Sequence, residues 1–531
     1  MAPHTFLWHD YETFGANTRR DRPAQFAAIR TDAALNEIGD PLMLYCQPAN
    51  DYLPDPQSCL ITGITPQLCL EKGVPEHDFA NRIEAEFAQP GTIGVGYNTI
   101  RFDDEITRFM FWRNLIDPYA REWQNQCGRW DLLDVVRMTY ALRPDGIAWP
   151  KKEDGTPSFK LEHLSKANGL LHEAAHDALS DVRATIALAR LIRQHNPKLF
   201  DFALSLHKKD RVAAELRLPA TALTARPFLH VSGMFPAERG CLAVMWPLAS
   251  HPTNKNEVIA WDLAHDPREL ATLGADEIRL RMFSRAADLP EGTTRLPIKT
   301  IHLNKSPMVV GNVNTLTPAL AQRWGMDLAQ AAQHADVART LPDMSGIWPA
   351  VFARPAEPAP DVDQDLYGGF VGNSDRRHLN DFAPCQGRNW PLRARALMTR
   401  AWPSWCGATG PATSRTPCRP KRSSAGRRTA PPACSTVRAG RAPWSSCSPR
   451  STRSRKPPTT TAPRRFWAPC TITPSTSRLN ADPPEALRAF PPRGTHPVAW
   501  QSQFHGCAGI WGAPVSRYSA HCKPTIIRNL L

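Results

Sequence analysis

Residues 6–14, FLWHDYETF, decide the fold of the first part of this 531-residue chain. The apolar run Phe6-Leu7-Trp8 predicts a buried strand, and two carboxylates follow it directly. Because residues i and i+2 of a strand point to the same face, Asp10 and Glu12 are expected on one face of the sheet. The sequence therefore predicts a buried strand that ends in a pair of like charges.

The segments after this strand alternate between strand and helix patterns. Further strands are predicted in QFAAIRTD (25–32), PLMLYCQP (41–48) and TIGVGYN (92–98). Apolar residues recur at helical spacing in 75–89 and in 176–194, and Asn196-Pro197 breaks the second of these helices. This alternation predicts an α/β (α+β) domain over residues 1–196, in which helices cover a mixed sheet.

The pattern changes between about residue 197 and residue 353. Short apolar runs such as CLAVMWPLA (241–249) and EVIAWDLA (257–264) are separated by Gly, Pro and Asn, which predicts a small β-rich domain with helical insertions. Residues 354–361, RPAEPAPD, have the composition of a linker. The following residues, up to 384, begin as ordinary amphipathic sequence.

The last 147 residues, 385–531, have a different composition. They hold 24 of the Lys and Arg residues and only two acidic ones, which leaves 40 basic and 48 acidic residues in 1–384. The net charge of +14 is therefore a property of this tail, which also holds eight of the 13 cysteines.

Two interpretations of the tail compete. One is a disordered basic tail that binds nucleic acid. The other is an out-of-frame translation of a GC-rich gene, which yields Arg, Pro, Ala, Gly, Ser and Cys. The preference for Arg over Lys and the many Cys and Trp residues favour the second interpretation.

The remaining bulk features predict a cytoplasmic protein. No run reaches the ~18–20 apolar residues that a spanning helix needs. The N-terminus has no basic segment before its apolar stretch, unlike a signal peptide. The five cysteines of the body lack CxxC spacing and are expected as reduced thiols.

The carboxylate pair suggests a metal site. Asp10 and Glu12 repel each other unless a cation neutralises them, and hard oxygen ligands suit Mg²⁺ or Mn²⁺. A solvated strand end is the plain alternative, because a DxE motif alone is weakly specific.

Two further motifs carry acidic residues. In GYNTIRFDDE (96–105), Asp103 opens a predicted helix over 103–115, although acidic residues also favour any helix N-terminus. In HDALSD (176–181), His176 lies on a loop and Asp181 in the first turn of the next helix.

The three motifs in this order resemble the DEDDh exonuclease superfamily. Together with RWDLLDV (129–135) and SFKLEHL (158–164), they resemble the exodeoxyribonuclease I family over residues 1 to about 384. The resemblance implies an RNase H-like nuclease domain, an SH3-like domain at about 202–350 and a helical domain after about 358. Little beyond Phe382 resembles that helical domain, which is therefore truncated or scrambled here.

The resemblance also implies roles for individual residues. Asp10, Glu12 and Asp181 would bind two Mg²⁺ ions, which Mn²⁺ can replace, and His176 would be the general base. Asp103 would be the fourth acidic residue, with Asp104 as an adjacent rival. The implied substrate-binding residues are Glu12, Arg108, Tyr119, Trp123, Arg137, Lys160, Phe202, Lys209, Asn256, Lys299, Asn304, Asp363 and Tyr367.

Two of these positions depart from the family pattern. Lys160 stands where an Arg is expected, which keeps the charge but loses bidentate recognition of phosphate. Phe202 stands where a Tyr is expected, which keeps the ring but loses the hydroxyl.

The expected function is that of a monomeric 3′→5′ exonuclease of single-stranded DNA in DNA repair and recombination. It would release 5′-mononucleotides and bind the acidic C-terminal tail of single-stranded DNA-binding protein. Smaller nucleases of the superfamily lack a counterpart of residues 200–350, so chain length argues against them. The alternative from another class is a non-catalytic or defective nucleic-acid-binding protein that acts through its basic tail.

Overall fold

The computed structural model describes residues 4–170, 177–221, 224–354 and 360–369. All of these belong to one of the two units into which internal contacts divide the chain. The expected general base, His176, lies outside the described residues, as do residues 370–384 and the basic tail 385–531.

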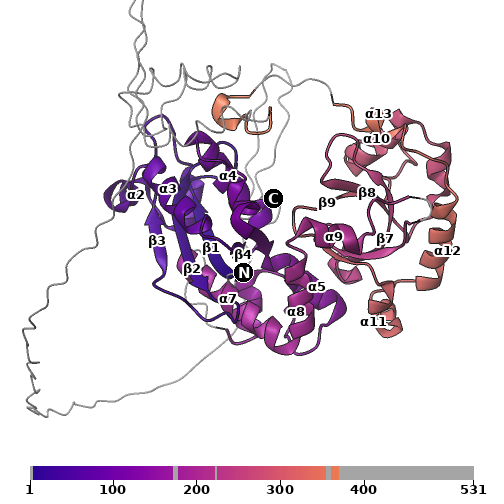
Figure 1. Ribbon diagram of the computed structural model, residues 1–531, viewed down its shortest axis with the longest axis horizontal. Helices are drawn as coiled ribbons and strands as arrows, with labels where there is room; N and C mark the ends of the chain where they lie inside the picture. The colour runs from indigo at the N-terminus through magenta and orange to yellow at the C-terminus, as the bar shows by residue number, and fades with distance from the viewer. Residues whose placement is uncertain (1–3, 171–176, 222–223, 355–359, 370–531) are drawn as a thin grey trace, which may run out of the picture. The chain divides into compact units, whose positions relative to one another are not determined.

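The first sheet is mixed, as the sequence predicts. Its strands are β1 (Thr5–Thr13), β2 (Pro23–Thr31), β3 (Leu42–Tyr45), β4 (Thr92–Gly96) and β5 (Gly128–Asp131), in the order β3-β2-β1-β4-β5 (Figure 1). β1 pairs antiparallel with β2 and parallel with β4, which places β1 at the centre of the sheet.

Alternation along β1 assigns its side chains to two separate cores. Phe6 and Trp8 pack on one face with residues of α5 (Leu132–Leu142) and α7 (Ala178–His195). Leu7 and Tyr11 pack on the other face with residues of α3 (Glu76–Phe87) and α4 (Asp103–Arg113). Because side chains alternate, Asp10 and Glu12 lie on the face that α7 covers.

Short helices complete this part of the chain. They are α1 (Pro56–Thr62), α2 (Pro66–Lys72), α6 (Leu161–Ala167) and the 3₁₀ turns η1 (Thr99–Arg101), η2 (Ala120–Glu122) and η3 (Gln124–Gln126). β5 and these 3₁₀ turns were not predicted from the sequence, because β5 (GRWD) has no apolar run and each turn has only three residues.

The helical structure continues beyond the predicted break. α7 ends at His195, as Asn196-Pro197 predicts, but α8 (Pro197–Ser205) starts at once with Pro at its first position, where no N–H donor is needed. Phe200 of α8 packs edge-on against Trp130 of β5. α9 (Lys209–Glu215) follows.

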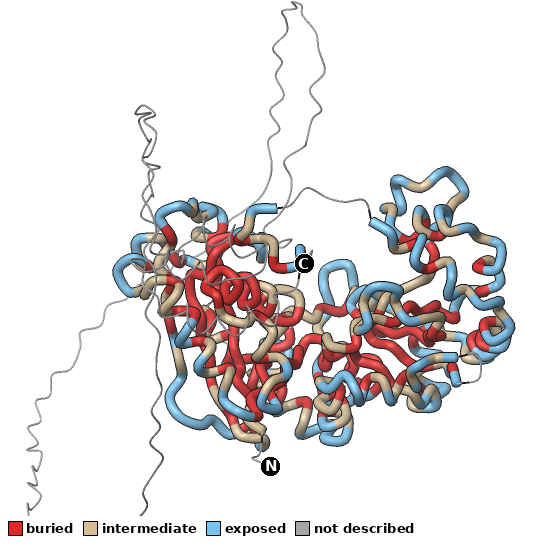
Figure 2. The backbone as a smooth tube through the Cα atoms, turned by 45° about the horizontal axis from the view of Figure 1, so that its top comes forward, coloured by how far each residue is buried: buried red, intermediate tan, exposed pale blue. Residues whose placement is uncertain are grey.

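The second sheet is wholly antiparallel and confirms the predicted β-rich character. Its strands are β6 (Phe228–Val231), β7 (Leu242–Ser250), β8 (Glu257–Asp262), β9 (Ile298–His302) and β10 (Met308–Val310), in the order β10-β6-β7-β8-β9. The strands of both sheets are largely buried, as the red tube in Figure 2 shows. The boundary expected at residues 196–197 stays a prediction.

The remaining elements are helical. They are η4 (Ala237–Arg239), η5 (Pro267–Thr272), α10 (Ala275–Phe283), η6 (Ala286–Asp288), η7 (Val313–Thr315), α11 (Pro318–Arg323), α12 (Leu328–Arg339), α13 (Trp348–Val351) and η8 (Val362–Gln364). Within the described ranges, no helix is long and apolar enough to cross a membrane.

Candidate active site

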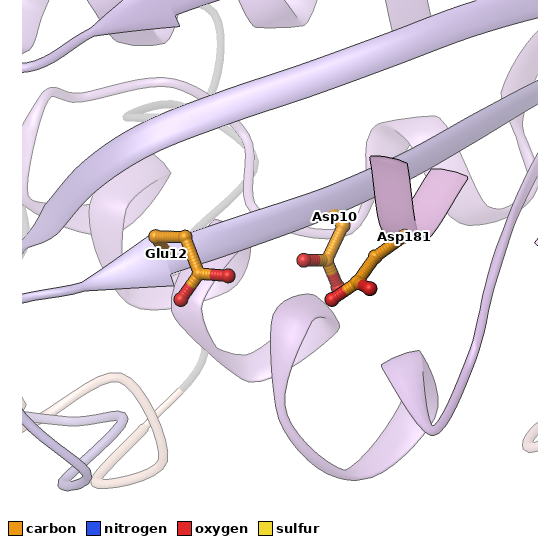
Figure 3. A group of neighbouring side chains, drawn as sticks. All are labelled: Asp10, Glu12 and Asp181. Atoms are coloured by element: carbon orange, nitrogen blue, oxygen red, sulfur yellow. The ribbon is translucent and has the colours of Figure 1, made fainter. Parts of the chain in front are cut away.

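β1 and α7 bring three carboxylates together. Asp10, Glu12 and Asp181 are each buried, and each offers an oxygen within 4.8 Å of the others (Figure 3). Figure 3 shows Asp10 and Glu12 on the strand and Asp181 pointing towards Asp10 from the neighbouring helix. Asp177 fixes the start of that helix, because its Oδ2 accepts the N–H of Ser180 at 3.1 Å.

Asp103 contacts the same stretch of β1 from α4. It is buried in the first turn of α4, and its Oδ1 accepts the backbone N–H of Tyr11 at 3.1 Å. Because Tyr11 lies between Asp10 and Glu12, this hydrogen bond ties α4 to the part of the strand that carries the acidic pair.

Asp104, the neighbour of Asp103, has a different environment. Its Oδ1 accepts from Nη2 of Arg121 at 2.6 Å, and its Oδ2 accepts from Nη1 of Arg129 at 3.0 Å. Burial opposes ionisation of Asp104, but the two guanidinium groups outweigh it and hold the pKa of this carboxyl well below its ordinary value. Asp104 is therefore a buried ion-pair residue.

Further ion pairs connect the partners of Asp104 to Arg108 of α4. Nε of Arg129 lies 3.3 Å from Oε2 of Glu122, and Glu122 holds Arg108 by two hydrogen bonds of 2.7 and 2.8 Å. Nη1 of Arg108 donates to Glu105 at 2.7 Å and to the hydroxyl of Tyr367 at 3.1 Å. The network could not be predicted from the sequence, because Tyr367 lies 259 positions from Arg108 and 262 positions from Glu105.

Comparison with known proteins places this site in a family. Residues 7–189 match the family described as “Exonuclease”, and residues 207–354 match the “Exonuclease I SH3-like domain”. The chain is 47% identical to Exodeoxyribonuclease I of Escherichia coli (strain K12) over 389 residues, which span 73% of this chain and 81% of that protein. The chain belongs to the exodeoxyribonuclease I family.

Other members of the exodeoxyribonuclease I family give the same result. Exodeoxyribonuclease I of Haemophilus influenzae (strain ATCC 51907 / DSM 11121 / KW20 / Rd) is 46% identical over 378 residues, 71% of this chain and 79% of that protein. The crystal structure of E. coli Exonuclease I in complex with a dA16 oligonucleotide has a TM-score of 0.72 at 45% identity, and covers 76% of this chain and 85% of that chain. The expected family and fold class are thus confirmed.

Three of the substrate-binding residues expected for an exodeoxyribonuclease I lie together at α4. The guanidinium of Arg108 stacks 5.2 Å from the ring centre of Tyr119 and contacts the hydroxyl of Tyr367. Burial is the main cause that raises the pKa of both tyrosines, to about 12 for Tyr119 and further for Tyr367, so both hydroxyls remain protonated at neutral pH. Trp123 follows η2 and is 61% exposed, unusually open for a tryptophan.

Two more expected residues lie close to each other at α5 and β9. Arg137 pairs with Asp134 at 2.7 Å, and Nζ of Lys299 donates to Oγ of Ser232 at 3.0 Å. Burial, Arg101 and Arg137 lower the pKa of Lys299 to about 8, although Asp134 acts in the opposite direction.

The other expected substrate-binding residues are spread over several elements. Lys160 directly precedes α6, and its Nζ lies 3.3 Å from Glu162. The ring of Phe202 in α8 lies 5.7 Å from the guanidinium of Arg211. Asp363 is buried and pairs with Arg22 at 3.2 Å. The others are Lys209, exposed at the start of α9, Asn256, before β8, and Asn304, whose carbonyl accepts from Arg129.

Proposed function

We propose that this chain is a 3′→5′ exonuclease that hydrolyses single-stranded DNA to 5′-mononucleotides. The observation that carries the proposal is the buried group of Asp10, Glu12 and Asp181, whose oxygens lie within 4.8 Å of one another. Membership of the exodeoxyribonuclease I family supports it, as does the likeness to an E. coli enzyme in complex with an oligonucleotide.

The three carboxylates fit divalent metal ions. Three negative charges at this separation and burial are unfavourable without a cation, and carboxylate oxygens are the ligands that Mg²⁺ and Mn²⁺ prefer. Two such ions, when bound, would activate the attacking water and neutralise charge on the leaving 3′-oxygen. Asp10, Glu12 and Asp181 would hold them.

The contacts of Asp103 and Asp104 support Asp103 as the fourth acidic residue. Asp103 is tied to the backbone between Asp10 and Glu12, whereas both oxygens of Asp104 are taken by buried arginines. Asp103 would add negative charge beside the other carboxylates, and Asp104 would hold α4 in position.

His176 would accept the proton of the attacking water, because an imidazole titrates near neutral pH. Its place in the chain supports this role, since it directly precedes Asp177, which caps the helix that carries Asp181. A histidine at this position would lie close enough to accept the proton without being a metal ligand itself.

The substrate would be held by cations for the backbone and aromatic rings for the bases. Arg108, Tyr119 and Tyr367 would form one such group, with Trp123 as an exposed ring beyond it. The acidic C-terminal tail of single-stranded DNA-binding protein would be a partner, because a solved complex joins that protein to an Exonuclease I of similar fold. An enzyme with this activity would act in DNA repair and recombination, in the cytoplasm.

The test compares Asp10→Asn and His176→Ala with wild type. We expect Asp10→Asn to lose both Mn²⁺ binding and the release of 5′-mononucleotides from oligo-dA. We expect His176→Ala to lose most turnover while it still binds DNA and Mn²⁺, because only the base is removed. Asp40→Asn, at an exposed position, is the matched control and should behave as wild type. Wild-type turnover by His176→Ala would refute the base assignment.

A further inference from the structure

Asp134 of α5 holds two arginines, and Lys299 of β9 lies near enough to interact electrostatically with all three residues. Asp134 of α5 accepts from Nη1 of Arg137 at 2.7 Å and from Nη2 of Arg101 at 3.1 Å. Asp134 itself is buried, whereas the Arg101 side chain is 34% exposed. Asp134 thus binds the guanidinium groups of Arg101 and Arg137 together, and Arg101 is the more exposed of the two.

Lys299 reaches the same place from the second sheet. Its Nζ donates to Oγ of Ser232 at 3.0 Å and lies 5.4 Å from the ring centre of Phe235. The next residue, Gly233, packs directly on Arg137: a Cβ at position 233 would lie 2.6 Å from Cζ of that arginine. A continuous set of contacts therefore joins Lys299 to Arg137 through the Ser232-Gly233 backbone.

The positive charge of this group exceeds what its carboxylates balance. The second carboxylate nearby, Asp131, already accepts the N–H groups of Asn98, Ile100 and Leu133. Burial, above all, raises its pKa to about 6, with Asp134 adding to the effect. His230 on β6 adds no charge, because burial keeps its pKa at about 3.

Each of the two arginines also has one buried nitrogen without a hydrogen-bond partner among the described residues. Within the described residues, Nη1 of Arg101 and Nε of Arg137 have no hydrogen-bond partner, and Nη1 of Arg101 lies 3.9 Å from Asp131. Buried donors without a partner are unfavourable, and an anion that approached the exposed part of the Arg101 side chain would offset the excess positive charge around them. Guanidinium and ammonium groups fixed in this way bind a phosphate with little loss of side-chain entropy.

We propose that Arg101, Arg137 and Lys299 form one binding site for a phosphate of the DNA backbone, in which Arg101 contacts the phosphate and Asp134 and Gly233 are positioning residues. The proposal rests on the proposed function and extends it, because it adds Arg101 as a DNA contact and explains how the cations are held together. An anionic DNA backbone is the ligand that such a cluster in a single-strand nuclease would take.

The site also makes DNA binding depend on pH. Between pH 7 and pH 8, Asp131 is ionised and Lys299 carries its proton whether or not a phosphate is bound, so affinity should change little with pH. Above pH 8, the free protein loses this proton, whereas a bound phosphate raises the pKa of Lys299 towards its ordinary value. Binding then takes up a proton, so affinity should fall up to tenfold for each pH unit.

The first experiment measures binding of fluorescent oligo-dA by anisotropy in EDTA, with the full chain, over a range of salt concentrations. We expect Arg101→Gln to lower the slope of log affinity against log salt by about 0.7, the value for one phosphate contact on a single strand. Arg339→Gln, which removes an exposed arginine from α12, is the control and should keep the wild-type slope. An unchanged slope in Arg101→Gln would overturn the assignment of Arg101.

The second experiment follows the same binding from pH 7 to pH 9.5. Lys299→Arg should remove the fall in affinity above pH 8, because a guanidinium stays charged throughout. Asp134→Asn should move the fall to lower pH, because Asp134 raises the pKa of Lys299. Its control is Asp336→Asn, which breaks an Asp–Arg pair of the same i,i+3 spacing and the same 2.7 Å length on α12. A wild-type pH profile in both Lys299→Arg and Asp134→Asn would refute the site.

A third variant leaves every charge in place. Gly233→Ala should lower affinity about tenfold, because the new Cβ displaces the guanidinium of Arg137. Gly346→Ala, where a Cβ meets nothing within 4 Å, is its control. Because EDTA prevents hydrolysis, these binding experiments test the phosphate site independently of the proposed nuclease activity. A protein without nuclease activity could still give the expected binding results, and an active nuclease could fail to give them.

Discussion

At the scale of the residue, Asp104 is the carboxylate whose loss should cost the most stability. It is 1% exposed and holds both Arg121 and Arg129, which are buried too. Asp104→Asn would leave the buried guanidinium of Arg121 without its paired carboxylate and Arg129 with Glu122 alone, which we expect to lower the free energy of unfolding by about 3–5 kcal/mol. Urea unfolding at pH 7 measures this loss.

The effect of Asp104 should also depend on pH. Because its folded-state pKa lies below the ordinary value, its stabilisation is complete above pH ~4 and is lost as the pH falls below that value. Wild type and Asp104→Asn should therefore converge in stability at acid pH. Asp336→Asn, in an exposed pair, should match wild type at every pH. A gap between wild type and Asp104→Asn that stays constant from pH 7 to pH 3 would contradict the ion-pair explanation.

Single residues of the acidic site could be found from the sequence, but their partners could not. Asp10 and Glu12 follow from the i, i+2 rule, whereas Asp181 was expected at the site only through the resemblance to the exodeoxyribonuclease I family. The pairs Asp104–Arg129 and Arg101–Asp134 span 25 and 33 positions and depend on which strands are neighbours. The same lack of three-dimensional information left Asp103 and Asp104 as rivals.

At the scale of the element, β4 must lie very close to β1. A Cβ at Gly96, the last residue of β4, would lie 2.5 Å from the carbonyl oxygen of His9 and 2.2 Å from Cγ2 of Thr99. Gly96→Ala must therefore push β4 away from β1, directly beside Asp10. We expect a loss of about 1–3 kcal/mol in the free energy of unfolding, together with a lower kcat.

Thermal unfolding and mononucleotide release would measure these two effects of Gly96→Ala. Gly346→Ala is the control, because a Cβ there meets no neighbour. Wild-type stability and kcat in Gly96→Ala would show that the contact between the strands tolerates a methyl group, against this expectation.

Sequence reasoning found the elements that show an apolar run or a periodic pattern. β1 and α7 have nine and 18 residues, so alternation and helical spacing are visible in them. β5 has four residues, as β3 does, but its sequence GRWD lacks the apolar run LMLY by which β3 was predicted. η1 has three residues, too few for a period to appear. α8 was missed because Asn196-Pro197 predicts a break but not that the chain resumes a helix immediately.

At the scale of the whole molecule, the question is which part of the chain acts on DNA. Residues 385–531 carry the basic excess, whereas the acidic group lies within residues 10–181. If the proposed function is right, a chain that ends at residue 384 should still release mononucleotides from oligo-dA with Mg²⁺. Loss of this activity, with DNA binding retained only by residues 385–531, would instead favour a nucleic-acid-binding protein that acts through its tail.

The same distribution predicts low processivity for the full chain. Sequence resemblance to the exodeoxyribonuclease I family stops near Phe382, so the phosphate contacts of a complete helical domain are not expected here. Fewer contacts mean faster dissociation between successive cleavages, since most differences in affinity between related complexes lie in the rate of dissociation. With a 5′-labelled DNA strand and an excess of unlabelled trap, the full chain should release intermediates much longer than those left by Exodeoxyribonuclease I of E. coli. Equal product lengths for the two enzymes would show that residues beyond 384 replace the missing contacts, and would restore the interpretation of a functional basic tail.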